Sequence, residues 1–192
     1  NDADYGITGF TVYSTFDNLL VRSADEAAIY VAGWSNKYDN SEFSYNKTGL
    51  SLASPSHQNM ISHCHGVNND EFGFKIVGSY AVVLTNCQIE TNKAAGVFLG
   101  SRTRGISIQG CYFEGNATVG YTFTNPVNHF VKSDIITTGG AQTSYISKSY
   151  PCSVGISDCF VHGLGEGQGK SLIFANGCEQ LSIDNVVVRT SV

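Results

Sequence analysis

One short phrase returns along this chain about every two dozen residues, and it limits the possible folds more than any other feature. Each copy places an apolar residue, two polar or small residues, and then a cysteine or an aliphatic residue. The clearest copies are residues 61–65, 84–88, 108–112 and 156–160, and an aliphatic residue replaces the cysteine at 16–20 and 183–187. A fixed period of this length, built from strand-like segments, is typical of a solenoid.

The third residue of each phrase serves as a register mark. The marks lie 22 to 27 residues apart, at Asn18, Asn40, His63, Asn86, Gly110, Ser133 or Asp134, Asp158 and Asn185. At the uncertain mark we favour Asp134, because Ser133 would turn the aspartate into the core without a partner. We expect corner amides that stack from coil to coil at Asn18, Asn40, Asn86 and Asn185.

A second phrase has the same period and alternates polar with apolar residues. Its copies are residues 28–31, 49–52, 73–76, 96–99, 120–123, 143–146 and 171–174. Alternation with a period of two indicates strands. The sequence therefore predicts an all-β fold with three short strands per coil, a parallel β-helix of about seven to eight coils. Successive coils would stack at the inter-strand spacing of roughly 4.8 Å.

The same alternation predicts which side chains fill the core. In the fifth coil the inward residues are Val82, Leu84, Cys87, Ile89, Val97 and Leu99. In the sixth they are Ile106, Ile108, Cys111, Phe113, Tyr121 and Phe123.

Four of the six cysteines fall in one inward column, at Cys64, Cys87, Cys111 and Cys159. Leu19 and Val186 occupy equivalent positions, so the position accepts a small hydrophobic side chain, and a free cysteine serves as one. We therefore favour unpaired thiols in this column. Cys152 and Cys178 are expected near one corner and are the candidate pair if a disulfide forms.

Composition excludes some classes of function. A net charge of −5 argues against nucleic acid as a partner, since phosphate binding needs a basic surface. No run of about twenty apolar residues suggests a membrane span. No Cys-x-x-Cys motif occurs, and alternating side-chain directions at 63–65 prevent convergence on one ion, so neither a metal nor a cofactor is predicted. Residues 1–192 are expected to form one domain, a fragment of a longer chain because the first coil starts within the pattern.

With its coils laid out in this way, the chain resembles the right-handed parallel β-helix superfamily. That superfamily includes pectate lyases, polygalacturonases and the tailspike and tail-appendage proteins of bacteriophages. The resemblance rests on the repeated apolar-x-Asn-Cys-x-apolar phrase over nearly the whole chain. Free buried cysteines favour the tailspike side, since tailspikes are made in a reducing cytoplasm. This resemblance implies a homotrimer on a virion tail that acts outside the cell, with a secreted protein as the alternative.

Two glutamates are the candidate catalytic residues. Glu90 and Glu114 are expected to be vertical neighbours in an outward column four residues past the mark. Two carboxylates one coil apart match the roughly 5–5.5 Å separation of a retaining glycosidase. Simple solvation of both side chains remains the alternative. His162, expected two coils away, and Asp70 and Glu71 of the most acidic turn are additional candidates; that turn could instead be hydrated or bind calcium.

Other outward residues are candidates for substrate binding. Tyr112 and Phe160 lie in a column beside the glutamates, where they either stack on sugar rings or pack against neighbouring chains of a trimer. The remaining candidates are Asn92 and Asn116, which follow the glutamates in matching phrases, and Arg102 and Arg104 at another corner.

The sequence thus predicts a tailspike-like β-helix that binds bacterial surface polysaccharide and cleaves it as an endo-glycosidase. A polysaccharide lyase using Arg102, Arg104 and Tyr112 is the first alternative. The second alternative is a non-catalytic shaft or receptor-binding scaffold. The identity of the glycan does not follow from the sequence.

Overall fold

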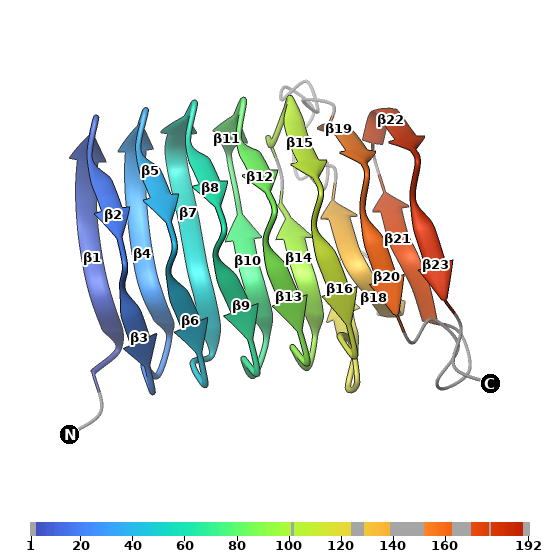
Figure 1. The fold of residues 1–192 in the computed structure, drawn as a ribbon, viewed down its shortest axis with the longest axis horizontal. Helices are drawn as coiled ribbons and strands as arrows, with labels where there is room; N and C mark the ends of the chain where they lie inside the picture. Colours follow the sequence, from blue (N-terminus) through green and yellow to red (C-terminus); the bar gives the residue numbers. More distant parts are fainter. Residues whose placement is uncertain are drawn as a thin grey trace.

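The computed structural model describes residues 3–100, 102–123, 129–138, 152–162, 170–176 and 178–189. Every regular element in these ranges is a β-strand. The strands form three sheets, here called A, B and C, in which each coil contributes one strand to each sheet. Figure 1 shows the coils side by side along the long axis, from blue to red. The predicted parallel β-helix with three strands per coil is confirmed.

The three sheets are parallel along their main paths. The main path of sheet A is β1 (Tyr5–Val12), β4 (Ala27–Trp34), β7 (Thr48–His57), β10 (Phe72–Ile76), β14 (Ala95–Leu99), β18 (His129–Thr138) and β21 (Lys170–Asn176), with β11 (Ser79–Tyr80) and β17 (Tyr121–Phe123) beside it. Sheet B contains β2 (Thr15–Asp17), β5 (Lys37–Asp39), β8 (Met60–Ser62), β12 (Val83–Thr85), β15 (Ile106–Gln109), β19 (Cys152–Ser157) and β22 (Cys178–Asp184). Sheet C contains β3 (Leu20–Arg22), β6 (Glu42–Ser44), β9 (His65–Val67), β13 (Gln88–Glu90), β16 (Tyr112–Glu114), β20 (Phe160–His162) and β23 (Val187–Arg189).

The register marks form the turn between sheets B and C. Seven of them have φ between 45° and 62°, namely Asn18, Asn40, His63, Asn86, Gly110, Asp158 and Asn185. This left-handed conformation is tolerated best by glycine, asparagine and aspartate, which explains the residue types at the mark.

The sixth mark, at Ser133 or Asp134, was placed wrongly. Ser133 and Asp134 lie within β18, a strand of sheet A, and not at a turn between sheets B and C. Strand β16 pairs directly with β20, so no further coil lies between them. Tyr121 and Phe123 belong to β17, which pairs antiparallel with β18 and is not the sheet A strand of a coil. Two described strands of sheet A, β17 and β18, lie between β16 and β19, so the period of the other coils does not apply to this part of the sequence.

A ladder of buried asparagines joins the coils at the turn between sheets C and A. Its members are Asn46, Asn69, Asn92 and Asn116, each no more than 1% exposed. The backbone N–H of Asn92 donates to Oδ1 of Asn116 (3.2 Å), and its side-chain amide donates to the carbonyl of Gly66 (2.7 Å). Oδ1 of Asn92 in turn accepts from the backbone N–H of Asn69 (3.2 Å). The ladder satisfies backbone groups that the turn would otherwise bury unpaired.

The corner amides at the register marks stack only in part. Asn40 donates to Asp17 (3.2 Å) and Asn185 to Asp158 (2.7 Å), each across one coil. Asn18 instead donates to the carboxylate of its neighbour Asp17.

Glycine near the start of sheet A strands leaves room for the asparagine ladder. A Cβ atom on Gly73 would lie 2.9 Å from the side-chain amide of Asn92 and 2.9 Å from the carbonyl oxygens of Gly66 and Gly96. These distances are shorter than side chains tolerate. The repeated glycine in the second sequence phrase is therefore a packing requirement.

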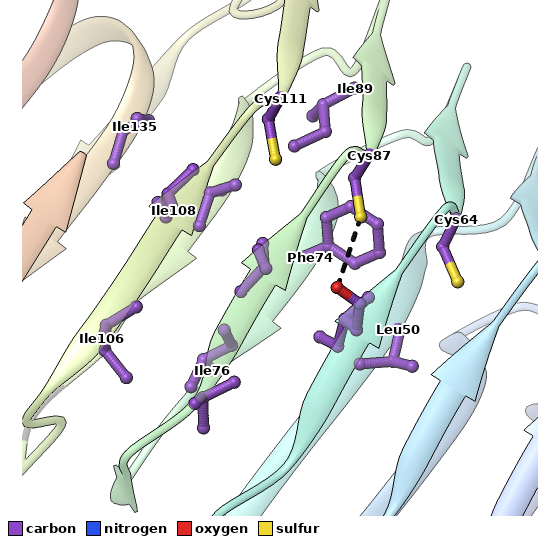
Figure 2. Close-up of a cluster of buried hydrophobic side chains, with 14 of the residues drawn as sticks. Leu50, Cys64, Phe74, Ile76, Cys87, Ile89, Ile106, Ile108, Cys111 and Ile135 are labelled. Atoms are coloured by element: carbon purple, nitrogen blue, oxygen red, sulfur yellow. Dashed lines mark hydrogen bonds between the residues drawn. The ribbon is translucent and has the colours of Figure 1, made fainter. Parts of the chain in front are cut away.

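The core matches the predicted inward columns wherever the side chains are described. All six inward residues of the fifth coil, and the first four of the sixth, are at most 2% exposed. Cys64, Cys87 and Cys111 point into this interior from successive coils (Figure 2). They and Cys159 are buried free thiols, so the predicted unpaired column is confirmed. Cys152 and Cys178 are register partners, but their side chains lie outside the described set and their pairing stays a prediction.

Candidate functional site

The outer face of sheet C brings the two predicted glutamates together. Glu90 and Glu114 are direct register partners on β13 and β16. The residues between the outward positions, Ile89 and Phe113, are fully buried, which fixes the glutamates on the solvent side. Both glutamates are half-buried on this face.

Each glutamate is held by the residue two positions earlier on its own strand. The hydroxyl of Tyr112 donates to Oε2 of Glu114 (2.7 Å), and the side-chain amide of Gln88 donates to Oε1 of Glu90. The bond to Glu114 raises the pKa of Tyr112 to about 12, with burial and nearby charge adding to it. The phenol is therefore protonated at neutral pH and remains a donor to the carboxylate.

The aromatic column beside the glutamates is stacked on itself. The rings of Tyr112 and Phe160 lie 5.5 Å apart and are nearly parallel, at 7°. The guanidinium of Arg189, from the next coil, lies 5.3 Å from the centre of the Phe160 ring. Neighbours on both sides thus occupy the faces of Phe160, which leaves its edge for contact with a ligand.

His162 lies closer to the pair than the sequence predicted. It is the register partner of Glu114 on β20, one coil away and not two, because the misplaced sixth mark had inserted a coil between them. Backbone register therefore places Glu90, Glu114 and His162 in one column on three successive coils.

Asn92 and Asn116 do not lie on the surface. They are 0% and 1% exposed and use their amides within the buried ladder. Their prediction as substrate-contacting residues is wrong, because they follow the glutamates at the position where the chain turns inward.

The two arginines lie at a different corner from the glutamates. Arg102 and Arg104 follow β14, at the turn from sheet A to sheet B. The guanidinium of Arg104 lies 5.7 Å from the centre of the Tyr80 ring. The whole of β15 separates this corner from Tyr112 on sheet C.

Two adjoining hollows lie beside the turn from sheet C to sheet A; Asp70 lines the first of them, and Glu71 lines both. The first, about 620 Å³, is walled by Tyr45, Lys47, Asp70 and Glu71 among others. The second, about 350 Å³, opens over sheet A and shares Lys47 and Glu71 with the first. We call the two together the corner groove. Asp70 also forms an ion pair with Lys93 (2.6 Å).

Sequence reasoning missed most of the corner groove. Its further walls include Tyr5, Asp25, Glu26, Tyr30 and Lys75. These residues come from turns and sheet A strands of different coils, and no single segment shows them as a cluster. The sequence did contain one clue to the groove. The charged residues Glu26, Lys47 and Glu71 each stand directly before the first residue of a sheet A strand.

No group of three or more histidine, cysteine, aspartate or glutamate side chains able to hold a metal ion occurs among the described residues. Over the same residues, no helix has the length and apolar character needed to cross a membrane.

Comparisons with known proteins agree with this architecture. The family described as "Right handed beta helix region" matches residues 2–188. A comparison with curated proteins gives no match.

Several solved structures share the fold at low sequence identity. The A-module of a mannuronan C-5 epimerase from Azotobacter vinelandii aligns with a TM-score of 0.78 and 16% identity, covering 98% of this chain and 52% of its own. A pectate lyase gives 0.62 and 16%, covering 97% and 54%. The tailspike protein of Pseudomonas phage LKA1 gives 0.54 and 12%, covering 96% and 43%. The chain thus spans about half the length of the structures it matches.

Proposed function

Because the chain belongs to the right-handed β-helix family, we propose that it binds a polysaccharide along its coils and cleaves it by glycoside hydrolysis. The in-register stacking of Glu90 and Glu114 is the observation on which this proposal rests. Stacked strands lie roughly 4.8 Å apart. That spacing is close to the roughly 5–5.5 Å between the two carboxyl groups of retaining glycosidases. Since one fold hosts many activities, the assignment depends on this pair and not on the family.

The proposal gives the two glutamates different roles. Glu114, whose Oε2 accepts a hydrogen bond from the Tyr112 hydroxyl, is assigned the role of nucleophile. Glu90 is then the acid. Glu114 attacks the anomeric carbon as the glycosidic C–O bond breaks, and Glu90 gives its proton to the leaving oxygen. Water deprotonated by Glu90 next releases the sugar from Glu114.

The names of the structural neighbours support a carbohydrate polymer as the ligand. The epimerase and the lyase are named for the polysaccharides mannuronan and pectate, and a third neighbour is a phage tailspike. On this basis we assign the chain a tailspike-like role on bacterial surface glycan, as a homotrimer on a virion tail. The alternative is that the protein is a secreted enzyme and is not attached to a virion.

The lyase alternative receives less support from the geometry. It needs a cation beside a base, yet Arg102 and Arg104 lie across β15 from Tyr112. A non-catalytic shaft requires only the coils themselves.

Product analysis tests the proposal. The protein is incubated with a panel of bacterial surface polysaccharides, and the fragments are examined by mass spectrometry. We expect fragments that have gained one water per cleavage. Glu90→Gln and Glu114→Gln should each lower turnover by roughly 10²- to 10⁴-fold with unchanged thermal unfolding.

Glu42→Gln is the matched control, because Glu42 lies on the same face of sheet C but pairs with Arg22 (2.7 Å), away from the glutamates. Full activity in both pair variants would remove the pair from consideration. Unsaturated fragments would identify a lyase. Binding of a polysaccharide without any cleavage fragments would favour the non-catalytic shaft or receptor-binding scaffold.

A further inference from the structure

The corner groove carries more negative than positive charge. Its walls hold four carboxylates, Asp25, Glu26, Asp70 and Glu71, against two lysines. Lys47 is occupied by both carboxylate oxygens of Glu26, at 3.0 and 2.9 Å. The second lysine, Lys75, lies over the Phe72 ring, 5.6 Å from its centre.

Two of these carboxylates remain available to a ligand. Asp70 is paired with Lys93, which approaches from the next coil. Asp25 and Glu71 form no ion pair with any of the residues that the structure describes. A carboxylate accepts hydrogen bonds and donates none when ionised, so these groups suit hydroxyl or ammonium donors.

The groove also offers aromatic surface. Tyr45 is 60% exposed in the larger hollow. In the smaller one, the Tyr5 and Tyr30 rings lie 5.2 Å apart. A concave site with aromatic walls and a few polar groups is the usual form of a small-ligand site.

A continuous corner leads from the groove to the glutamate pair. The residue directly after each sheet C strand forms this corner, in the order Ser23, Tyr45, Asn68, Thr91 and Gly115. Ser23 and Tyr45 line the larger hollow, and Thr91 and Gly115 directly follow Glu90 and Glu114. The hydroxyl of Thr91 donates to the side chain of Asn68 (2.6 Å). This bond connects the part of the corner beside the groove with the part beside the glutamates. Coils stack at roughly 4.8 Å, about the length of one sugar residue.

We propose that the corner groove is a binding subsite for neutral or amino-bearing sugar residues and excludes uronic acids. This names the substrate class of the cleavage site and so rests on the proposed function. Among the groove charges that form no ion pair with a described residue, the two carboxylates Asp25 and Glu71 outnumber the one ammonium, Lys75, so the groove repels a sugar carboxylate on balance. Hydroxyl or ammonium groups of a sugar would instead donate to the two carboxylates. The substrate therefore differs in charge from the mannuronan and pectate for which the two structural neighbours are named.

Binding without turnover tests the substrate class. The Glu90→Gln/Glu114→Gln double variant is applied to an array of bacterial polysaccharides sorted into neutral, amino-bearing and uronic classes. We expect binding to neutral and amino-bearing polymers only, with the amino-bearing class more sensitive to salt. Binding to uronic polymers, or to none of the three classes, would overturn the proposal.

Charge removal tests the location. In the same background, Asp25→Asn and Glu71→Gln should each weaken binding of amino-bearing polymers by about fivefold, as expected for one unit charge near 4 Å in water. Glu42→Gln is the control, since Glu42 lies outside the groove and should change nothing. Unchanged affinity in both groove variants would place the subsite elsewhere. Cleavage of a uronic polymer by the unmodified protein would uphold the hydrolase and contradict the groove, so the two failures are distinguishable.

Discussion

Single residues in this protein often serve two coils at once, and Asn92 is the clearest case. It lies at a turn of its own coil, receives a bond from Asn69 before it, and donates one to Asn116 after it. A buried amide with every partner satisfied stabilises the structure, but removing it leaves several buried groups unpaired. The cost of losing one ladder residue therefore exceeds that of an ordinary hydrogen bond.

We predict that Asn92→Leu lowers the free energy of unfolding by roughly 3–5 kcal/mol, because it strands the Asn69 N–H and the Gly66 carbonyl. Urea denaturation followed by circular dichroism measures the change. Gln109→Leu is the control: it also replaces an amide with leucine, but at an exposed position on sheet B, and it should cost within about 0.5 kcal/mol. Equal stability of the two variants would contradict a structural role for the ladder.

At the scale of the element, the packing of sheet A strands depends on the atoms that surround their first residues. Gly73 faces the Asn92 amide and two carbonyl oxygens at distances that admit no Cβ. We predict that Gly73→Ala destabilises the fold by roughly 2 kcal/mol or more, through overpacking against backbone that cannot move freely. The comparison is Gly155→Ala on β19, where the nearest atom to an added Cβ lies 4.0 Å away. Thermal melts that fall equally for both would show that the close packing at Gly73 has no special cost.

The elements also show where sequence reasoning succeeds and where it stops. Inward columns such as Leu84 and Ile89 were predictable because one alternating pattern decides both strand and core. The sequence did not distinguish the asparagines of the register marks from those of the buried ladder. Both sets recur with the same period, although Asn86 is exposed at its turn and Asn92 is buried. The sheet A strand β18 was misread because β17, which pairs antiparallel with it, lies between β16 and β18 and shifts the count of residues.

The candidate site divides in the same way. Stacking of Glu90 on Glu114 followed from counting residues within the repeat. The adjacency of His162 to that pair did not, because β16 and β20 are paired strands that lie much further apart in the sequence than one repeat. Apart from Asp70 and Glu71, the corner groove was missed, since its walls meet only when several coils are stacked.

Across the whole molecule, each coil contacts only its neighbours, so stability is a sum of local terms and the ends open first. In a chain of these 192 residues, the inward side chains of Ile183 on β22 and Val188 on β23 are 47% and 45% exposed. Their register partners one coil inward, Ile156 and Val161, are at most 1% exposed. The cysteine column can report how readily each coil opens, because its four buried thiols lie in different coils along the axis.

We predict slow alkylation of the column in native buffer at pH 8, in a background carrying Cys152→Ser and Cys178→Ser. Burial raises the pKa of Cys64 to about 11, and hydrogen bonding to Cys111 together with burial raises that of Cys159, so little reactive thiolate forms in the folded state. Cys159, one coil from the end, should react first and Cys87, in a central coil, among the last. Peptide mass spectrometry over time gives the order. Identical rates at all four sites would mean that the coils open only together.

The buried ladder has a consequence for how the chain can be produced. Two of its asparagines, Asn46 and Asn116, begin Asn-x-Thr tripeptides, the acceptor sequence for N-linked glycans. Such glycans attach to the side-chain nitrogen, and at Asn46 and Asn116 that nitrogen donates to a carbonyl of the preceding coil. With each residue only 1% exposed, a glycan has no room in the folded protein. Folding and glycosylation at these positions exclude each other, and a host that glycosylates the nascent chain would prevent the coils from closing.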